Sequence, residues 1–173
     1  MKQRGSERAF PVAWNISSYR FRLSLPMIAI VSQPLTPVIL DGAHVPFNLA
    51  AVLHDLNRIR EFAGFCVVVF GTTRDKQAFE MLDLLRQHRV DVIICTGSTS
   101  GPPSWAPGEL RRFAEELDLA AEELSQPRDA VMWASALARG RGWILVTGSF
   151  RIVGEIRSII RELEARQRPI PAQ

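Results

Sequence analysis

The apolar residues of this chain follow two patterns that alternate along the sequence. Short continuous apolar runs, typical of strands buried on both faces, are followed by stretches in which apolar residues recur as on one face of a helix. The runs predict strands at 38–40, 65–70, 91–96, 119–121 and 143–147. The helical spacing predicts helices at about 46–59, 74–88, 110–117, 129–139 and 152–163. The alternation indicates an α/β fold: a Rossmann-like, mostly parallel sheet with helices on both faces.

The N-terminal part of the chain is patterned differently. Residues 1–17 show little periodicity, and we predict a flexible segment there. Over 19–25 apolar and polar residues alternate, which is typical of a strand with one solvent-facing side, and 27–31 can form a second strand. Residues 32–37 are rich in turn formers and are predicted to be a loop. We expect the N-terminal strand to be antiparallel.

Length and composition favour one globular domain. The 173 residues are 47% hydrophobic and 23% charged, so we expect a single domain over 18–166 and a tail at 167–173. The net charge of +3 is small and scattered, which argues against nucleic acid as a partner. No apolar run is long enough for a membrane span. Cys66 and Cys95 lie in apolar runs and are expected to be buried and reduced, so we predict a cytoplasmic protein.

Polar side chains follow three of the predicted strands at the point where each strand ends. Asp41-Gly42-Ala43-His44 comes after the first buried strand, Asp75-Lys76 follows the second, and Thr147-Gly148-Ser149 follows the last. Because ligands of open α/β sheets bind beyond the carboxyl ends of the strands, these segments are candidates for a shared site.

Each of these residues also has a purely structural interpretation. Asp41 can cap the following turn, His44 can be a helix-start residue, and Ser149 can be an ordinary helix N-cap. Asp75 and Lys76 can lie in the solvated first turn of a helix, where the acid is favourable to the helix dipole. From the residues alone, the structural interpretation of Asp41 and His44 is the favoured one.

At these positions the chain resembles the C-terminal domain of folylpolyglutamate synthase and dihydrofolate synthase, within the Mur ligase superfamily. Residues 40–46 are close to the family's LDGAHNP, Asp75-Lys76 to its DKD, and 145–150 to its LVTGSL, in family order. The resemblance implies an ATP-dependent ligase that activates a folate-like carboxylate as an acyl phosphate and joins glutamate to it. It also implies a P-loop ATPase domain, over which the C-terminal domain closes.

The resemblance further implies roles for five residues. Asp41 and His44 would act in catalysis and contact the nucleotide, and Arg20, in a degenerate PGRF-like segment, would be another nucleotide contact. Ser149 and Lys76 would bind substrate, with Ser149 holding the amino acid. The implied cofactor is ATP with magnesium, held mainly by the P-loop domain, and no metal ligand is predicted in this chain.

Several positions depart from the family pattern. Val45 stands where the family has Asn, Gln77 replaces the second acid of DKD, Phe150-Arg151 replaces Leu-Tyr, and the loop 102–106 lacks an arginine that the family often carries. No GxxxxGK[ST] phosphate-binding motif occurs, so the chain alone is not expected to catalyse ligation.

Three hypotheses follow. The chain is the closing domain of a ligase that works with a P-loop ATPase domain in cis or in trans. Alternatively, it is a non-catalytic, stand-alone binding or regulatory module derived from such a ligase. The third possibility is an unrelated nucleotide-binding α/β module.

Overall fold

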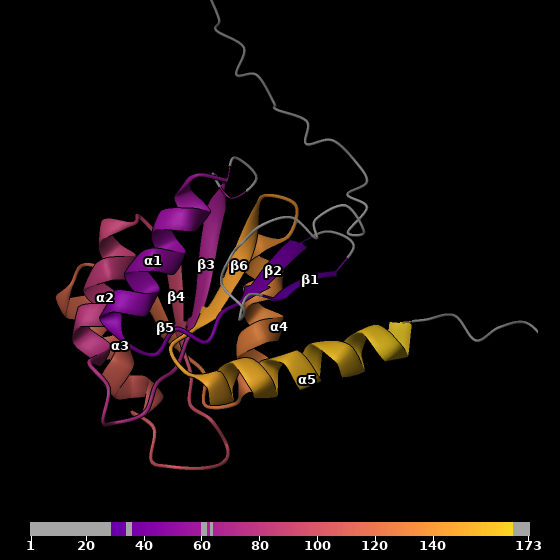
Figure 1. Cartoon of the computed structure of the whole chain (residues 1–173). Helices are drawn as coiled ribbons and strands as arrows, with labels where there is room; N and C mark the ends of the chain where they lie inside the picture. Colours follow the sequence, from indigo (N-terminus) through magenta and orange to yellow (C-terminus); the bar gives the residue numbers. More distant parts are fainter. Residues whose placement is uncertain (1–28, 34–35, 60–61, 63, 168–173) are drawn as a thin grey trace, which may run out of the picture.

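Six strands form one sheet in the computed structural model, which describes residues 29–33, 36–59, 62 and 64–167. The strands are β1 (Ala29–Gln33), β2 (Thr36–Leu40), β3 (Phe65–Phe70), β4 (Val92–Cys95), β5 (Ala121–Glu123) and β6 (Gly142–Thr147). Their order across the sheet is β1-β2-β6-β3-β4-β5 (Figure 1). From β2 to β5 all neighbours are parallel, whereas β1 pairs with β2 in the antiparallel direction.

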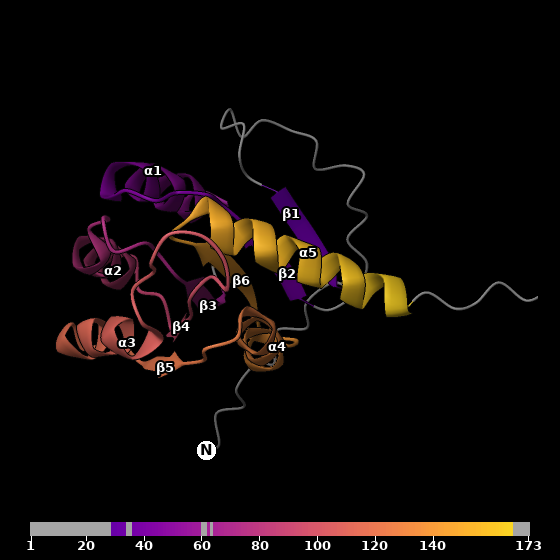
Figure 2. The same cartoon turned by 90° about the horizontal axis from the view of Figure 1, so that it is seen from below.

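Five helices in the described part of the chain cover the two faces of this sheet. They are α1 (Pro46–Asn57), α2 (Ala78–Gln87), α3 (Pro107–Glu116), α4 (Pro127–Ala138) and α5 (Phe150–Gln167). One hydrophobic cluster joins the sheet to α1, α2 and α3, and a second joins it to α4 and α5. Seen from below, the sheet lies between these two layers (Figure 2).

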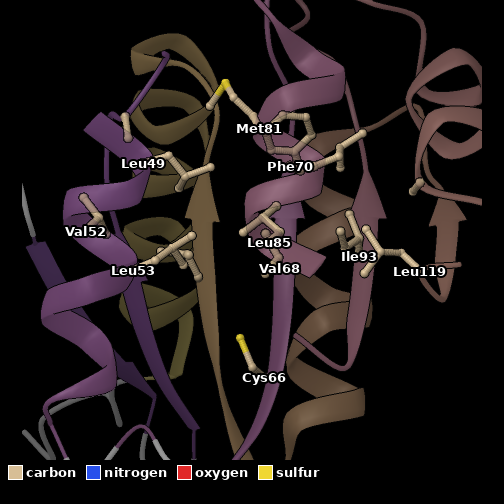
Figure 3. Close-up of a cluster of buried hydrophobic side chains, with 14 of the residues drawn as sticks. Leu49, Val52, Leu53, Cys66, Val68, Phe70, Met81, Leu85, Ile93 and Leu119 are labelled. Atoms are coloured by element: carbon tan, nitrogen blue, oxygen red, sulfur yellow. The ribbon is translucent and has the colours of Figure 1, made fainter. Parts of the chain in front are cut away.

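The pleat of the strands explains why both faces need a cover. In β3, Val68 and Phe70 belong to the cluster with α1 to α3, while Val67 and Val69 belong to the cluster with α4 and α5. All four side chains are fully buried. Figure 3 shows the first cluster, in which Leu49 of α1 approaches the sheet together with side chains of α2.

The predicted fold class is confirmed: the sheet is mostly parallel, and helices lie on both of its faces. The short apolar runs are indeed the buried strands, because a central parallel strand exposes neither face to water. Cys66 and Cys95 are buried, as expected, and form no disulfide.

The predicted helix over 74–88 is wrong at its start, since α2 begins only at Ala78. The preceding residues form a turn in which the Lys76 amide donates to the Thr73 carbonyl at 3.0 Å. The Thr73 hydroxyl also donates to the Asp75 carboxylate at 2.5 Å. Local hydrogen bonds of this kind compete with the helical ones, so Asp75 and Lys76 precede the helix and are not in its first turn.

Two further boundaries differ from the prediction. The strand expected at 119–121 is shifted to β5, because Ala121 is the residue that pairs with Ile93 of β4. The segment 32–37, expected to be a loop, contributes residues to both β1 and β2, and Pro37 pairs with Ser32. Proline is tolerated there because it stands near the start of β2, one residue before the pairing of β2 with β6 begins at Val38.

Several predictions lie outside the described residues: the flexible segment 1–17, the alternating strand 19–25 and most of the tail 167–173. Within the described ranges, none of the helices has the length and apolar character that crossing a membrane requires.

Candidate functional site

The ends of β2 and β6 are joined into one structure at the carboxyl edge of the sheet. The Asp41 amide donates to the Val146 carbonyl at 3.0 Å, and the Gly148 amide donates to the Ala43 carbonyl at 3.0 Å. The Thr147 hydroxyl donates to the same Ala43 carbonyl at 3.4 Å. Because the two strands are parallel neighbours, segments more than 100 residues apart in sequence form a single rigid edge.

Asp41 forms the base of this edge. Its Oδ1 accepts a hydrogen bond of 2.7 Å from the Ala43 amide, so the turn-capping contact expected under the structural interpretation is present. The residue is only 3% exposed. Burial raises the pKa of the Asp41 carboxyl above its ordinary value, and the hydrogen bond from Ala43 offsets part of that rise. Asp41 is therefore a buried acid whose charged form lacks a compensating cation among the described residues.

His44 lies between the turn and the start of α5. Its ring is half-buried and packs against the Phe150 ring, with 4.9 Å between centroids and 47° between planes. Its Nδ1 lies 3.1 Å from the Gly42 carbonyl oxygen. Since a carbonyl can only accept, Nδ1 carries the proton, and Nε2 is left for a ligand. Neutral His44 can accept through Nε2, and protonated His44 can donate.

Ser149 begins the last helix as its N-cap. Its Oγ accepts a hydrogen bond of 3.2 Å from the Ile152 amide, and the residue is buried. The preceding Gly148 has a φ of +106°, and a Cβ there would lie 2.6 Å from the Gly71 carbonyl oxygen. Glycine is therefore required at this turn, which leads from β6 into α5.

Lys76 pairs with its neighbour in the sequence. Its ammonium group pairs with the Asp75 carboxylate at 3.0 Å, and no described hydrogen bond or ion pair joins it to Asp41, His44 or Ser149. The Thr73 hydroxyl and then Lys76 lower the pKa of the Asp75 carboxyl. Arg20 lies outside the described residues.

Two phenylalanines in the first turns of α1 and α5 are exposed, and the sequence analysis singled out neither as a site residue. Phe47, in the first turn of α1, is 83% exposed, and Phe150, in the first turn of α5, is 49% exposed. The helical period indicated an exposed Phe47, because Phe47 does not lie on the apolar face that Leu49, Val52 and Leu56 form. The signal for Phe150 was its departure from the family pattern.

The arrangement supports ligand binding through acceptors, an imidazole and helix amides. A buried carboxylate can accept from hydroxyl groups or an ammonium, and a helix N-terminus favours an anion. Within the described ranges no three His, Cys, Asp or Glu side chains gather closely enough to hold a metal ion. These features define an α/β domain with polar side chains held together at the carboxyl edge of its sheet.

The family model described as "Mur ligase, glutamate ligase domain" matches residues 27–150. The chain therefore belongs to the glutamate ligase domain family of the Mur ligases. No curated protein sequence matches it.

Solved structures of folylpolyglutamate synthases are similar to the chain. E. coli FolC in complex with DHPP and ADP is 25% identical, with a TM-score of 0.67, and the match covers 81% of this chain and 31% of that one. The bifunctional folylpolyglutamate synthase/dihydrofolate synthase of Yersinia pestis with Mn, AMPPNP and L-glutamate bound is 27% identical, with a TM-score of 0.68, covering 80% and 32%. Mycobacterium tuberculosis folylpolyglutamate synthase complexed with ADP is 26% identical, with a TM-score of 0.65, covering 72% and 30%. This chain thus spans about a third of the length of these proteins.

Proposed function

We propose that this chain is the C-terminal domain of an ATP-dependent acid–amino-acid ligase of the folylpolyglutamate synthase type. The observation that carries the proposal is the joined edge of β2 and β6, which holds Asp41, His44 and Ser149 together in a domain of the matching family. The similar solved proteins bind adenine nucleotides, and one of them also binds L-glutamate. The proposed reaction takes place in the cytoplasm.

The described residues fit part of a nucleotide. Asp41 keeps Oδ2 without a described hydrogen-bond partner, so it can accept from a ribose hydroxyl. His44 keeps Nε2, which can accept from a ribose hydroxyl when the ring is neutral or donate to a phosphate oxygen when it is protonated. When bound, ATP supplies the phosphoryl group that activates the substrate carboxylate. Arg20 is a further proposed nucleotide contact, and this proposal rests on its place in the PGRF-like segment of the sequence. A magnesium ion would be held outside this chain, because the described residues offer no ligand cluster.

The amino-acid side of the reaction is assigned to the start of α5. Ser149 caps the helix with its oxygen and retains a hydroxyl proton to donate, and the first amides of α5 favour a carboxylate. Lys76 is a proposed substrate contact that would have to leave Asp75. This exchange is feasible because surface ion pairs are weak.

A P-loop ATPase domain, in cis or in trans, completes the proposal. The sequence contains no phosphate-binding GxxxxGK[ST] motif, and the similar proteins are about three times as long as the matched region. A folate-like carboxylate and glutamate are the proposed substrates.

The test is glutamate-dependent ADP release by the chain combined with the P-loop domain encoded nearest to it in its own genome. We expect release only from the combination, and we expect His44→Ala to lower the rate about 100-fold, as loss of a hydrogen bond to transferring groups does. The matched control is His54→Ala, because His54 is an exposed histidine of α1. Equal rates for His44→Ala and His54→Ala would contradict the proposal.

A non-catalytic binding module is the second candidate, and Val45 favours it. Val45 is the N-cap residue of α1 and makes no side-chain capping bond, so the amide of the family's Asn is missing beside the site. This alternative predicts ligand binding by the chain without ADP release from any combination.

A further inference from the structure

A groove beside the candidate site runs between the starts of α4 and α5 and the loop that joins β4 to α3. Its lining includes Thr99, Ser100, Arg128, Phe150, Arg151 and Glu155. Figure 2 shows this loop passing beside the start of α5. The groove adjoins the candidate site, because Phe150 lines the groove and also packs on His44 of the site.

The loop wall of the groove is fixed by Glu155 of α5. One Glu155 carboxylate oxygen accepts from the Ser98 hydroxyl at 3.1 Å and the Thr99 amide at 3.2 Å. The other oxygen accepts from the Thr99 hydroxyl at 2.5 Å. Both oxygens are therefore engaged with the loop, although Glu155 lies one helical turn from Arg151 and is otherwise suited to pair with it.

The Arg151 guanidinium lies against the backbone of Gly101 in the same loop. A Cβ at position 101 would overlap the Nη1, Cζ and Nε atoms of Arg151, and Gly101 has a φ of +94°. Only glycine allows both this backbone conformation and this close approach. The loop is thus shaped to receive the guanidinium.

Two arginines, Arg128 and Arg151, line the groove. Arg128 pairs with Glu162, whereas Arg151 has no ion pair among the described residues. Within the described residues, the Arg151 side chain makes no hydrogen bond or ion pair. A guanidinium presents donors in a planar fork that matches the two oxygens of a carboxylate.

The position of Arg151 relates it to the proposed amino-acid site. It is the second residue of α5, two residues after Ser149, and it lines the groove together with Phe150. The groove therefore begins at the same helix start, so an amino acid whose α-carboxylate lies at the α5 amides can extend its side chain along it. A second carboxylate at the end of that side chain would meet the Arg151 fork.

We propose that Arg151 binds the side-chain carboxylate of the amino-acid substrate and thereby selects a dicarboxylic amino acid over a neutral one. This proposal rests on the proposed function, because it takes the amino acid to bind at the start of α5. Arg151 is a specificity residue here, with no role in the phosphoryl or acyl transfer.

The test is an NMR titration of the 173-residue chain with L-glutamate and, separately, with L-glutamine, following the backbone amides of Thr99 and Gly101. Glutamine has the same shape without the charge, so we expect glutamate to bind about tenfold more tightly. Arg151→Gln should remove this preference and leave the glutamine affinity unchanged. Arg157→Gln, an exposed arginine of α5 outside the groove lining, should keep it.

Three results would overturn the inference: equal affinities for the two amino acids, a preference that persists in Arg151→Gln, or the absence of binding by either. Gly101→Ala provides a second variant that keeps the charge but displaces the guanidinium, and it should lose the preference as well. Failure of the proposed function would be seen separately, as absent ADP release despite an Arg151-dependent preference for glutamate.

Discussion

At the scale of single residues, Asp41 has two roles that oppose each other energetically. Its carboxylate caps the turn through the Ala43 amide, which stabilises the edge where β2 ends. The same carboxylate is buried, and burial disfavours its charged form. A group that only capped the turn could be an uncharged asparagine. Asp41 therefore keeps an ionisable group where the capping contact alone does not need one.

Asp41→Asn should raise the thermal stability of the chain at pH 7. Folding raises the pKa of the Asp41 carboxyl. The folded protein is therefore destabilised as the pH rises from the ordinary pKa toward the folded-state pKa, and this stability is not regained at higher pH. Asparagine keeps the acceptor for the Ala43 amide and carries no charge. Thermal denaturation of the unchanged chain and of Asp41→Asn across pH 3 to 7 measures the difference in melting temperature.

The stability difference should vanish near pH 3, where the Asp41 carboxyl is neutral in both states. The control is Asp129→Asn, which removes an exposed carboxyl from α4 and so reports the effect of losing a surface charge. A lower melting temperature for Asp41→Asn at pH 7 would show that the buried charge stabilises the fold.

At the scale of elements, α1 and α5 differ in how their N-termini are capped. Ser149 caps α5 with its side chain, whereas Val45 at the N-cap of α1 makes no such bond and leaves the first amides of α1 without it. Pro46 at the next position has no amide and partly compensates. The start of α1 is the less stabilised of the two.

Val45→Asn should therefore stabilise α1. An asparagine at an N-cap accepts from a first-turn amide and contributes about 1 kcal/mol, which raises the melting temperature by roughly 2–4 °C in a domain of this size. Val45→Ala is the matched control, since it shortens the side chain without adding an acceptor. Equal unfolding free energies for the two variants, measured in urea, would show that position 45 does not cap the helix.

At the scale of the whole molecule, the aromatic side chains at the site are exposed without contributing to the core. Phe47 belongs to neither hydrophobic cluster, and Phe150 contacts only His44 among the described aromatic pairs. Exposed large apolar side chains at the start of a helix are candidates for contact with another domain. The similar solved proteins are about three times as long as the region that matches this chain.

If the proposed P-loop domain covers this surface, Phe47→Ser should weaken its association with the chain without lowering the stability of the chain. Phe47 is 83% exposed, so its removal leaves no cavity, whereas loss of an aromatic anchor typically weakens an interface about tenfold or more. Calorimetric titration of the two domains measures the affinity. The control is Phe79→Ser, an exposed phenylalanine of α2, and an equal loss of affinity in both variants would contradict the assignment.

The extent to which sequence predicted the molecule differs between fold and site. The central strands β3, β4 and β6 and the apolar part of β2 were predictable, because their apolar runs are continuous in sequence, and so was Ser149 as an N-cap. The position of β5 and the extent of β1 and β2 were not. The start of α2 was not, since the Thr73 to Asp75 hydrogen bond and the turn around it favour a non-helical backbone. The pairing of Lys76 with Asp75 also required the structure.

The sequence by itself determined the α/β class, the family motifs and the absence of a phosphate-binding motif, because each depends on neighbouring residues or on their period. Only the tertiary structure decided that the Asp41 carboxylate is buried, that Phe150 packs on His44 and that Arg151 lies against Gly101. These contacts join residues about 50 to 110 positions apart, and the order of strands in the sheet brings them together. Local pattern carries no information about such pairs, since burial and partner choice arise only when the elements pack.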